Sequence, residues 1–496
     1  MDRIACSPVV PPTRSVLQTF GGGRMFAVIV AVQLALGGLM LLDFRLPVLT
    51  VLAVAVVVVA LKWPLGAVAG LLAARIIGTA SMSWMRIGSI NLGLFEPVLA
   101  LCLVALVYHA MVRRQSVLHT WPWRGPFLAF MGWQALGLFW CTQLGQGLQE
   151  FIASGIILVN CTLILTFVRS VEDYQKVFYA WIGASVMVGV LSMFTDLTGV
   201  GSSGSSWEIA AGGGRETGLG QQPNWFAMNL MFSVHTCFGF AVVTRKRALR
   251  WLLIAAGLYI FISQLRSGSR GGAYSLVIGG ALVALAHPLF RRWMIRFAAV
   301  AAALFFFYVV IDGGSSTSKA FTRIAMNVTN TWGSDVRELN WFASIQMFGD
   351  TWGRGIGPGG YPEMLADYSW KLYTSIHRYP HGIFWGLVAH YGVIGLAVAG
   401  WLLWSVFQMA RDLVVRTKGT AVEIFAWTMP ATMLGYIAWS FVEFSWDDKP
   451  FWEFLSVYTA LYLAVCRGAE LPSLRAGVRL PWNREPVPDG PTVEPA

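Results

Sequence analysis

The sequence predicts an all-α, polytopic membrane bundle of about 12–14 spanning helices, with a long helical loop on the outer face near the C-terminal third. Three observations predict this class. Hydrophobic residues make up 56% of the 496 residues and charged residues 12%, against ~25% charged in a typical globular domain. The mean hydropathy is +0.60. The apolar residues also fall in runs close to the ~20 residues that a helix needs to cross the hydrocarbon core.

The apolar runs give the candidate spans in chain order. They cover residues 25–42, 46–61, 64–79, 94–112, 126–141, 151–168, 177–196, 225–243, 251–265, 272–286, 297–311, 382–410, 424–441 and 451–466. The second and third runs are short enough to form one broken helix or a re-entrant pair. The first run lacks a clear small-residue cleavage site, so we expect it to be retained rather than removed as a signal peptide.

The basic residues set the expected orientation, because lysine and arginine concentrate in cytoplasmic loops. The basic clusters between the spans fall on one side, which predicts that both termini are cytoplasmic. The predicted divisions are a cytoplasmic N-terminal tail at 1–24, a transmembrane bundle at 25–311 with an outer segment at 197–224, a large outer loop at 312–381, C-terminal transmembrane helices at 382–466 and a cytoplasmic tail at 467–496.

Charge and motif content exclude several function classes. The formal net charge of +11 does not indicate a nucleic-acid partner, because the basic residues are spread between apolar runs. The six cysteines lack CxxC or Cys/His spacing, so we interpret them as small core residues. No nucleotide-binding loop and no DxD, HExxH or GxSxG motif occurs. We therefore expect no metal site and no cofactor.

Three arginines lie on the predicted outer face, where few cations are expected. Arg215 lies in a glycine-rich segment before Pro223 and Asn224 open a span, and Arg266 and Arg270 flank a tight turn. If that turn is helical, their spacing of four puts both on one face. A guanidinium near a bilayer is costly without a partner, and its fork matches phosphate oxygens, which favours a pyrophosphate site. The alternative is that each arginine snorkels to a headgroup or pairs with a carboxylate.

The long outer loop carries Arg337 and Arg354 together with many aromatic residues, among them Trp341. A segment of about seventy residues is too long for a passive connector, so we expect a small helical cap with an aromatic-lined cavity. Glycines around Arg354 would let the backbone approach a ligand closely. Tryptophan and tyrosine rings can stack on sugars, although they can also form a belt at the membrane interface.

The loop ends with His377, Arg378 and His381 at the mouth of the next span. Histidine titrates near neutral pH, so His377 or His381 could act as a general base on a hydroxyl. The alternative is that these histidines are polar residues packed in the fold. Their position on the outer face beside Arg378 favours a functional site.

These segments together resemble the O-antigen ligase and polysaccharide polymerase superfamily of bacterial inner-membrane glycosyltransferases. The resemblance rests on four pieces in order: Arg215-x-x-Gly218 with Pro223-Asn224, Ser269-Arg270-Gly-Gly, Arg337 with Trp341 followed by Gly355-Ile-Gly357, and the stretch from His381 to Gly395. Two positions depart from similar proteins. Gly382 stands where asparagine is frequent, and His390 stands where many carry an acid.

The resemblance implies a metal-independent, inverting transfer of a glycan from undecaprenyl diphosphate to an acceptor hydroxyl at the periplasmic face. Carried over by motif, Arg215 and Arg270 would hold the departing diphosphate, and His381 would position or deprotonate the acceptor. The acceptor would be a glycan, a lipid or a protein side chain. The expected substrate-binding residues are Arg266, Arg337, Arg354, His377, Arg378, Asn224 and Trp341.

A transporter or flippase of the same lipid-linked glycan is the alternative, because a basic cavity would bind the same diphosphate. Transporters usually show internal repeats and coupling acids at mid-membrane. This chain has one long asymmetric loop, no repeated half, and few acids, which lie near the ends of the predicted spans. The sequence therefore favours the enzyme.

Overall fold

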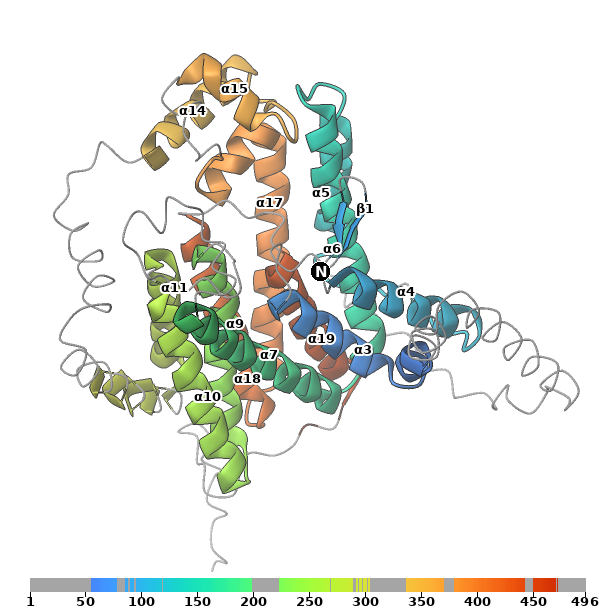
Figure 1. Ribbon diagram of the computed structural model, residues 1–496, viewed down its shortest axis with the longest axis vertical. Coiled ribbons are helices and arrows are strands. Elements are labelled where there is room, and N and C mark those ends of the chain that lie inside the picture. The colour runs from blue at the N-terminus through green and yellow to red at the C-terminus, as the bar shows by residue number, and fades with distance from the viewer. Residues whose placement is uncertain are drawn as a thin grey trace, which may run out of the picture.

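The computed structural model describes residues 55–77, 85–87, 90–92, 95–117, 119–198, 223–267, 269–288, 291–292, 294–296, 298–300, 302–303, 336–369, 379–441, 449–469 and 471. Most of this part of the chain is helical, which confirms the predicted class at the level of a helical membrane bundle (Figure 1). One short antiparallel hairpin, β1 (Met85–Ile87) with β2 (Ile90–Leu92), departs from an all-α chain.

Five helices of the described residues are long and apolar enough to cross a membrane. They are α6 (Leu144–Phe167), α7 (Val171–Thr198), α9 (Pro223–Val243), α10 (Arg247–Arg266) and α17 (Ile383–Arg416). Other described helices are α3 (Pro64–Ile77), α4 (Phe95–Met111), α5 (Arg124–Gly137), α11 (Arg270–Ala286), α14 (Val336–Asp350), α15 (Tyr361–Tyr368), α18 (Val422–Ser440) and α19 (Lys449–Cys466). The count of 12–14 spans stays a prediction.

The expectation of either one broken helix or a re-entrant pair near the N-terminus is confirmed. The helix Ala55–Lys62 and α3 pass the apolar test together but bend by 110° at the break between them. Trp63 lies at this break, directly before Pro64. Proline disfavours helical geometry in the residue that precedes it, which explains why the helix breaks here.

The centre of the bundle is α9, which is buried nearly throughout, whereas α10 keeps most of its surface exposed. Contacts from α7, α10, α11 and α18 surround α9 (Figure 1). A helix that is apolar on every side is stable when other helices cover every side of it. The sequence of α9 has apolar residues on every side, so its burial is expected. Its polar side chains bond mostly within the bundle, as when Thr236 Oγ1 donates to the Phe232 carbonyl at 2.8 Å.

A smaller second core lies at one extremity of the molecule, where α14 and α15 pack beside the beginning of α17 (Figure 1). It consists of Ala343, Met347, Ile356, Tyr361, Leu365 and Ala389. We call α14, the glycine loop 353–360, α15 and residues 383–391 of α17 the cap. The cap is built from part of the predicted outer loop and from the first turns of the helix that follows it.

Candidate functional site

Four helix ends meet at one end of the bundle. The short turn 244–246 returns α10 alongside α9, and the turn 267–269 then begins α11 beside the end of α10. The beginnings of α9 and α11 are in contact, since a Cβ placed at Gly272 would lie 2.6 Å from the Ala227 Cβ. The beginning of α9, the end of α10 and the beginning of α11 therefore lie together.

The end of α18 reaches the same place, because α18 runs antiparallel to α11. A Cβ at Gly435 would lie 2.5 Å from the Ser275 carbonyl oxygen, and Gly279 faces Ala431 in the same way. One further turn brings the end of α18 to the beginning of α11. There the Phe441 carbonyl oxygen lies 2.9 Å from the Cβ position of Gly382. We call this region, with His381 and Gly382, the His381 end.

The beginning of α11 is a well-formed helix N-terminus. The Ser269 side chain caps it by accepting a hydrogen bond from the Gly272 amide at 3.2 Å. Gln264 Nε2 ties the end of α10 to this turn by donating to the Gly272 carbonyl at 2.8 Å. A helix N-terminus carries partial positive charge and favours an anion.

His381 lies in a buried and conformationally special turn. Its φ of +48° is in the left-handed region, which non-glycine residues adopt rarely and at a cost of about 1 kcal/mol or more. Trp341 Nε1 donates to the His381 carbonyl oxygen at 2.8 Å, and the Trp341 ring stacks on Trp385 at 5.8 Å. The Tyr379 ring packs against the imidazole with a centroid distance of 4.0 Å.

Gly382 follows His381 with φ +147°, a conformation that favours glycine. A Cβ there would also lie 3.0 Å from Trp385 Cδ1. This geometry accounts for the glycine at position 382.

Several predicted site residues lie at the His381 end. Asn224 is half-buried in the first turn of α9, and Arg266 is half-buried at the end of α10. Arg337 is half-buried on α14, one turn before Trp341, so it lies on the same helix face as that tryptophan. Arg270 begins α11, and its side chain lies outside the described residues.

Three other predicted site residues, Arg215, His377 and Arg378, lie outside the described residues altogether. The conditional expectation for the arginine pair is not met, because Arg266 ends one helix and Arg270 begins the next. The spacing of four therefore does not place them on one helix face.

Arg354 lies apart from the His381 end. Its guanidinium packs over the Trp140 ring at 5.0 Å, and Trp140 Nε1 donates to the Gly355 carbonyl at 3.1 Å. Its backbone contacts Gly392, about 15 Å along α17 from Gly382 at 1.5 Å per residue. The contacts of Arg354 hold the glycine loop against the corner between α5 and α6.

A second polar cluster was not anticipated from the sequence. Glu150 of α6 lies with its Oε2 3.7 Å from His390 Nδ1 and accepts a hydrogen bond from the Tyr391 hydroxyl at 3.0 Å. Its Oε1 accepts the Gly359 amide at 3.0 Å. Glu150 is the one charged residue in the 24-residue sequence of α6. A lone acid in an apolar helix indicates a functional residue, so the sequence alone could have identified Glu150 as a candidate.

Tyr361 packs on the other side of this cluster, where its ring stacks on His390 at 5.7 Å. Its hydroxyl donates to the Asn340 carbonyl at 2.9 Å on α14. Burial raises the pKa of Tyr361 well above its ordinary value, so the phenol stays neutral and acts as a hydrogen-bond donor. This tyrosine joins α15, α14 and α17.

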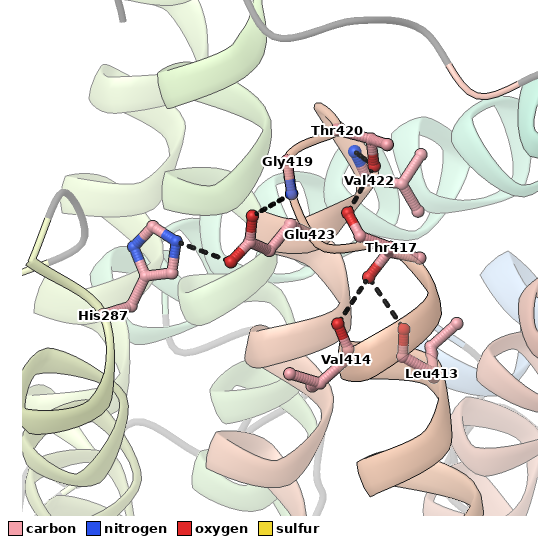
Figure 2. A network of polar contacts seen from close by, with 8 residues as sticks. All are labelled: His287, Leu413, Val414, Thr417, Gly419, Thr420, Val422 and Glu423. Atoms are coloured by element: carbon pink, nitrogen blue, oxygen red, sulfur yellow. Dashed lines mark hydrogen bonds and ion pairs between the residues drawn. The ribbon is translucent and has the colours of Figure 1, made fainter. Parts of the chain in front are cut away.

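Two more polar contacts link acids to basic side chains inside the bundle. Arg75 Nε lies 3.3 Å from Glu453 Oε1, which also accepts Asn160 Nδ2 at 2.8 Å. At the opposite end of α11 from Arg270, His287 Nε2 lies 3.7 Å from Glu423 Oε1 (Figure 2). Both acids are buried in the bundle, and each lies in the first two turns of its helix, Glu423 in α18 and Glu453 in α19.

The His381 end combines a histidine, a helix N-terminus, half-buried arginines and stacked tryptophans. A scan against models of protein families finds no match for this chain, and a search of curated proteins finds no similar sequence. The function of this end is therefore inferred from its residues and their geometry.

Proposed function

We propose that the protein is a glycosyltransferase that moves a glycan from undecaprenyl diphosphate to an acceptor hydroxyl. The enzyme would be O-antigen ligase-like or polysaccharide polymerase-like, inverting and metal-independent. The observation that carries the proposal is the meeting of His381 with the beginning of α11 at one end of the bundle. These two segments are far apart in the sequence, and each belongs to one piece of the family resemblance.

The chemistry needs one base and one anion site. His381 would take the proton of the acceptor hydroxyl as the oxygen forms its bond to the anomeric carbon. The bond from that carbon to the diphosphate oxygen breaks on the opposite side, which inverts the configuration. Arg215, Arg270 and the N-terminus of α11 would stabilise the negative charge that develops on the diphosphate.

The cap supplies features suited to binding a sugar. Trp341 and Trp385 form a stacked pair next to His381, and Arg337 lies one turn from Trp341. Aromatic faces and planar donors are well matched to sugar rings and their hydroxyls. Glycan, lipid or protein acceptors would all present the same hydroxyl chemistry.

The protein would then lie in a bacterial inner membrane. It would be a multi-pass protein with about 12–14 spans, both termini in the cytoplasm and the His381 end in the periplasm. The cap would then be periplasmic. The clusters of basic residues between the spans support this orientation.

A transporter or flippase of the same lipid-linked glycan is the second candidate. The contact between Glu150 and His390 and that between Arg75 and Glu453 favour it, since paired ionisable groups inside a bundle can serve in coupled transport. The asymmetric cap favours the enzyme, because transporters of this kind are usually built from repeated halves.

The deciding experiment is a transfer assay with the purified protein in nanodiscs, a lipid-diphosphate-linked oligosaccharide and a panel of acceptors, with EDTA present. Native protein should form product, while His381→Ala and Arg270→Ala should lower the rate by about 10²–10⁴-fold. Arg270→Lys should recover little activity because it loses the bidentate fork. Arg247→Ala is the matched control, since Arg247 lies exposed at the other end of α10 from Arg266.

Two results would count against the enzyme. Full activity in His381→Ala and Arg270→Ala, with Arg247→Ala inactive, would mean that the site lies at the opposite end. No product with any acceptor, together with movement of the lipid between leaflets of a liposome, would establish the transporter.

A further inference from the structure

We infer that Glu150 is a positioning residue that clamps the cap to the bundle and thereby sets the place of His381. Its effect on catalysis rests on the proposed glycosyl transfer, whereas the clamp itself does not. Glu150 touches none of the proposed reacting groups, and it acts through the glycine loop and the first turns of α17.

The contacts of Glu150 are all with distant parts of the chain. Its two oxygens accept the Gly359 amide and the Tyr391 hydroxyl, each at 3.0 Å, and His390 Nδ1 lies 3.7 Å from Oε2. A carboxylate on an otherwise uncharged apolar helix is costly unless hydrogen bonds and charge compensate for lost water. The cap supplies these partners, so docking of the cap and stabilisation of Glu150 occur together.

The glycine loop packs against α17 at the point where the helix is interrupted. Gly392 has φ +61° and ψ −154°, which interrupts the helical hydrogen bonds. The Ala389 and His390 carbonyls accept instead from the Ile356 and Gly357 amides, at 2.8 and 2.9 Å. The Val393 amide donates to the Gly353 carbonyl at 2.9 Å. The loop thus replaces the missing turn of the helix.

The glycine loop packs so closely that its glycines have no room for a side chain. A Cβ at Gly355 would lie 2.6 Å from the His390 carbonyl oxygen, and one at Gly357 would lie 2.7 Å from the Gly137 carbonyl oxygen. A Cβ at Gly359 would overlap the Gly147 amide. The loop is therefore held between α17 on one side and the corner of α5 and α6 on the other.

The clamp reaches His381 by two short routes. Residues 383–391 form a helical segment that begins directly after the His381 turn and carries His390 and Tyr391 at its end. Tyr361 stacks on His390 and bonds Asn340 on α14, the helix whose Trp341 donates to the His381 carbonyl. Loosening Glu150 would move both α14 and the His381 turn.

Cys141 provides a native reporter of the clamp. Its thiol is half-buried and donates to the Leu138 carbonyl at 3.3 Å. The glycine loop covers it, since a Cβ at Gly357 would lie 3.0 Å from the Cys141 Cβ. Lifting the loop would expose this thiol to a maleimide, and the labelled residue can be identified by mass spectrometry against a Cys141→Ser background.

The test compares native protein with Glu150→Ala, Glu150→Gln, His390→Glu and the double variant Glu150→His with His390→Glu. Glu150→Ala should raise the rate of Cys141 labelling by about tenfold, as expected for losing hydrogen bonds to a charged group. Glu150→Gln should raise it less, because an amide oxygen can still accept the Gly359 amide. The double variant should label more slowly than either Glu150→Ala or His390→Glu, because it restores an acid facing a histidine.

The activity readout separates positioning from simple loss of folded protein. Glu150→Ala should lower kcat by about tenfold for the folded fraction and leave KM for the lipid donor nearly unchanged. Glu363→Gln is the matched control, because Glu363 is an exposed acid of α15 that joins the cap to α6 by a separate hydrogen bond, accepted from Gln146 Nε2 at 3.0 Å, which a glutamine oxygen can still accept. It should leave both labelling and kcat at native levels.

Native labelling of Cys141 in folded Glu150→Ala would overturn the clamp, whatever the activity. Fast labelling with unchanged kcat would overturn the positioning role, because the cap would have loosened without consequence. If the native protein transfers no glycan at all, the proposed function fails, and the labelling rates still decide whether the clamp exists.

Discussion

Glu150 and Glu423 each have a carboxylate oxygen 3.7 Å from a histidine ring nitrogen, one at each end of the bundle. Glu423 is in the first turn of α18, and its other oxygen accepts the Gly419 amide at 2.7 Å, only four residues away (Figure 2). Thr420 Oγ1 accepts the Val422 amide at 3.2 Å in the same turn. Glu423 thus closes the local turn that precedes α18, and His287, directly after α11, adds one tertiary contact.

Glu150 has the reverse arrangement. Its amide donor, Gly359, is 209 residues away, and its hydroxyl donor, Tyr391, is 241 residues away. A glutamate next to a histidine therefore has a different role at each end of the bundle. At the Glu423 end it fixes a turn whose sequence already favours it, whereas at Glu150 it joins segments that no local rule would bring together.

The largest expected effect comes from breaking the fit between the glycine loop and α17. Gly392→Ala places a side chain in a backbone region that is nearly confined to glycine, and the new Cβ would overlap the Gly353 carbonyl oxygen. We expect a loss of about 3 kcal/mol or more in stability, seen as a lower unfolding temperature, together with fast labelling of Cys141.

The matched control for that variant lies in the same helix. Gly400 is an exposed glycine of α17 with no atom within 4 Å of its Cβ position. Gly400→Ala should raise stability by up to about 1 kcal/mol, because alanine favours the helix over glycine. Equal unfolding temperatures for the two variants would mean that the break at Gly392 does not hold the cap.

The next effect tests whether the Glu423 end is purely structural. Glu423→Ala removes the acceptor of the Gly419 amide and the partner of a buried histidine, so we expect a loss of about 2 kcal/mol in stability. Transfer activity per folded molecule should stay native, in contrast to Glu150→Ala. Glu423→Gln keeps an acceptor and should lose less stability. A fall in kcat at constant folded protein would remove the distinction between the two ends.

The fold followed from the sequence where the signal was local. Apolar runs predicted the long helices, and the short second and third runs predicted a broken helix or a re-entrant pair, which the bend before Pro64 agrees with. The glycines after Ser269 and the proline before Asn224 marked the beginnings of α11 and α9. Each of these features depends on a few neighbouring residues, so one sequence contains the information.

The Glu150 cluster could not be assembled from the sequence in the same way. A lone acid in an apolar helix marks an unusual residue, but nothing local identifies Gly359, His390 or Tyr391 as its partners. The acidic partner of His390 is Glu150, which lies on a different helix, α6. Tertiary contacts over such separations depend on the packed fold rather than on local preference.

The smallest expected effect measures how much each partner of Glu150 contributes to docking of the cap. Tyr391→Phe removes one hydrogen bond to the Glu150 carboxylate and the one accepted from Gln134 Nε2 at 3.0 Å, while Trp133 Nε1 still donates to the Tyr391 carbonyl at 2.8 Å. A hydrogen bond to a half-buried carboxylate contributes about 1 kcal/mol net, so Cys141 labelling should rise by about fivefold, less than in Glu150→Ala. Labelling as fast as in Glu150→Ala would assign the whole clamp to the hydroxyl and leave His390 without effect. Labelling at the native rate would assign the clamp to Gly359 and His390. The double variant Glu150→His with His390→Glu should then label Cys141 at the native rate.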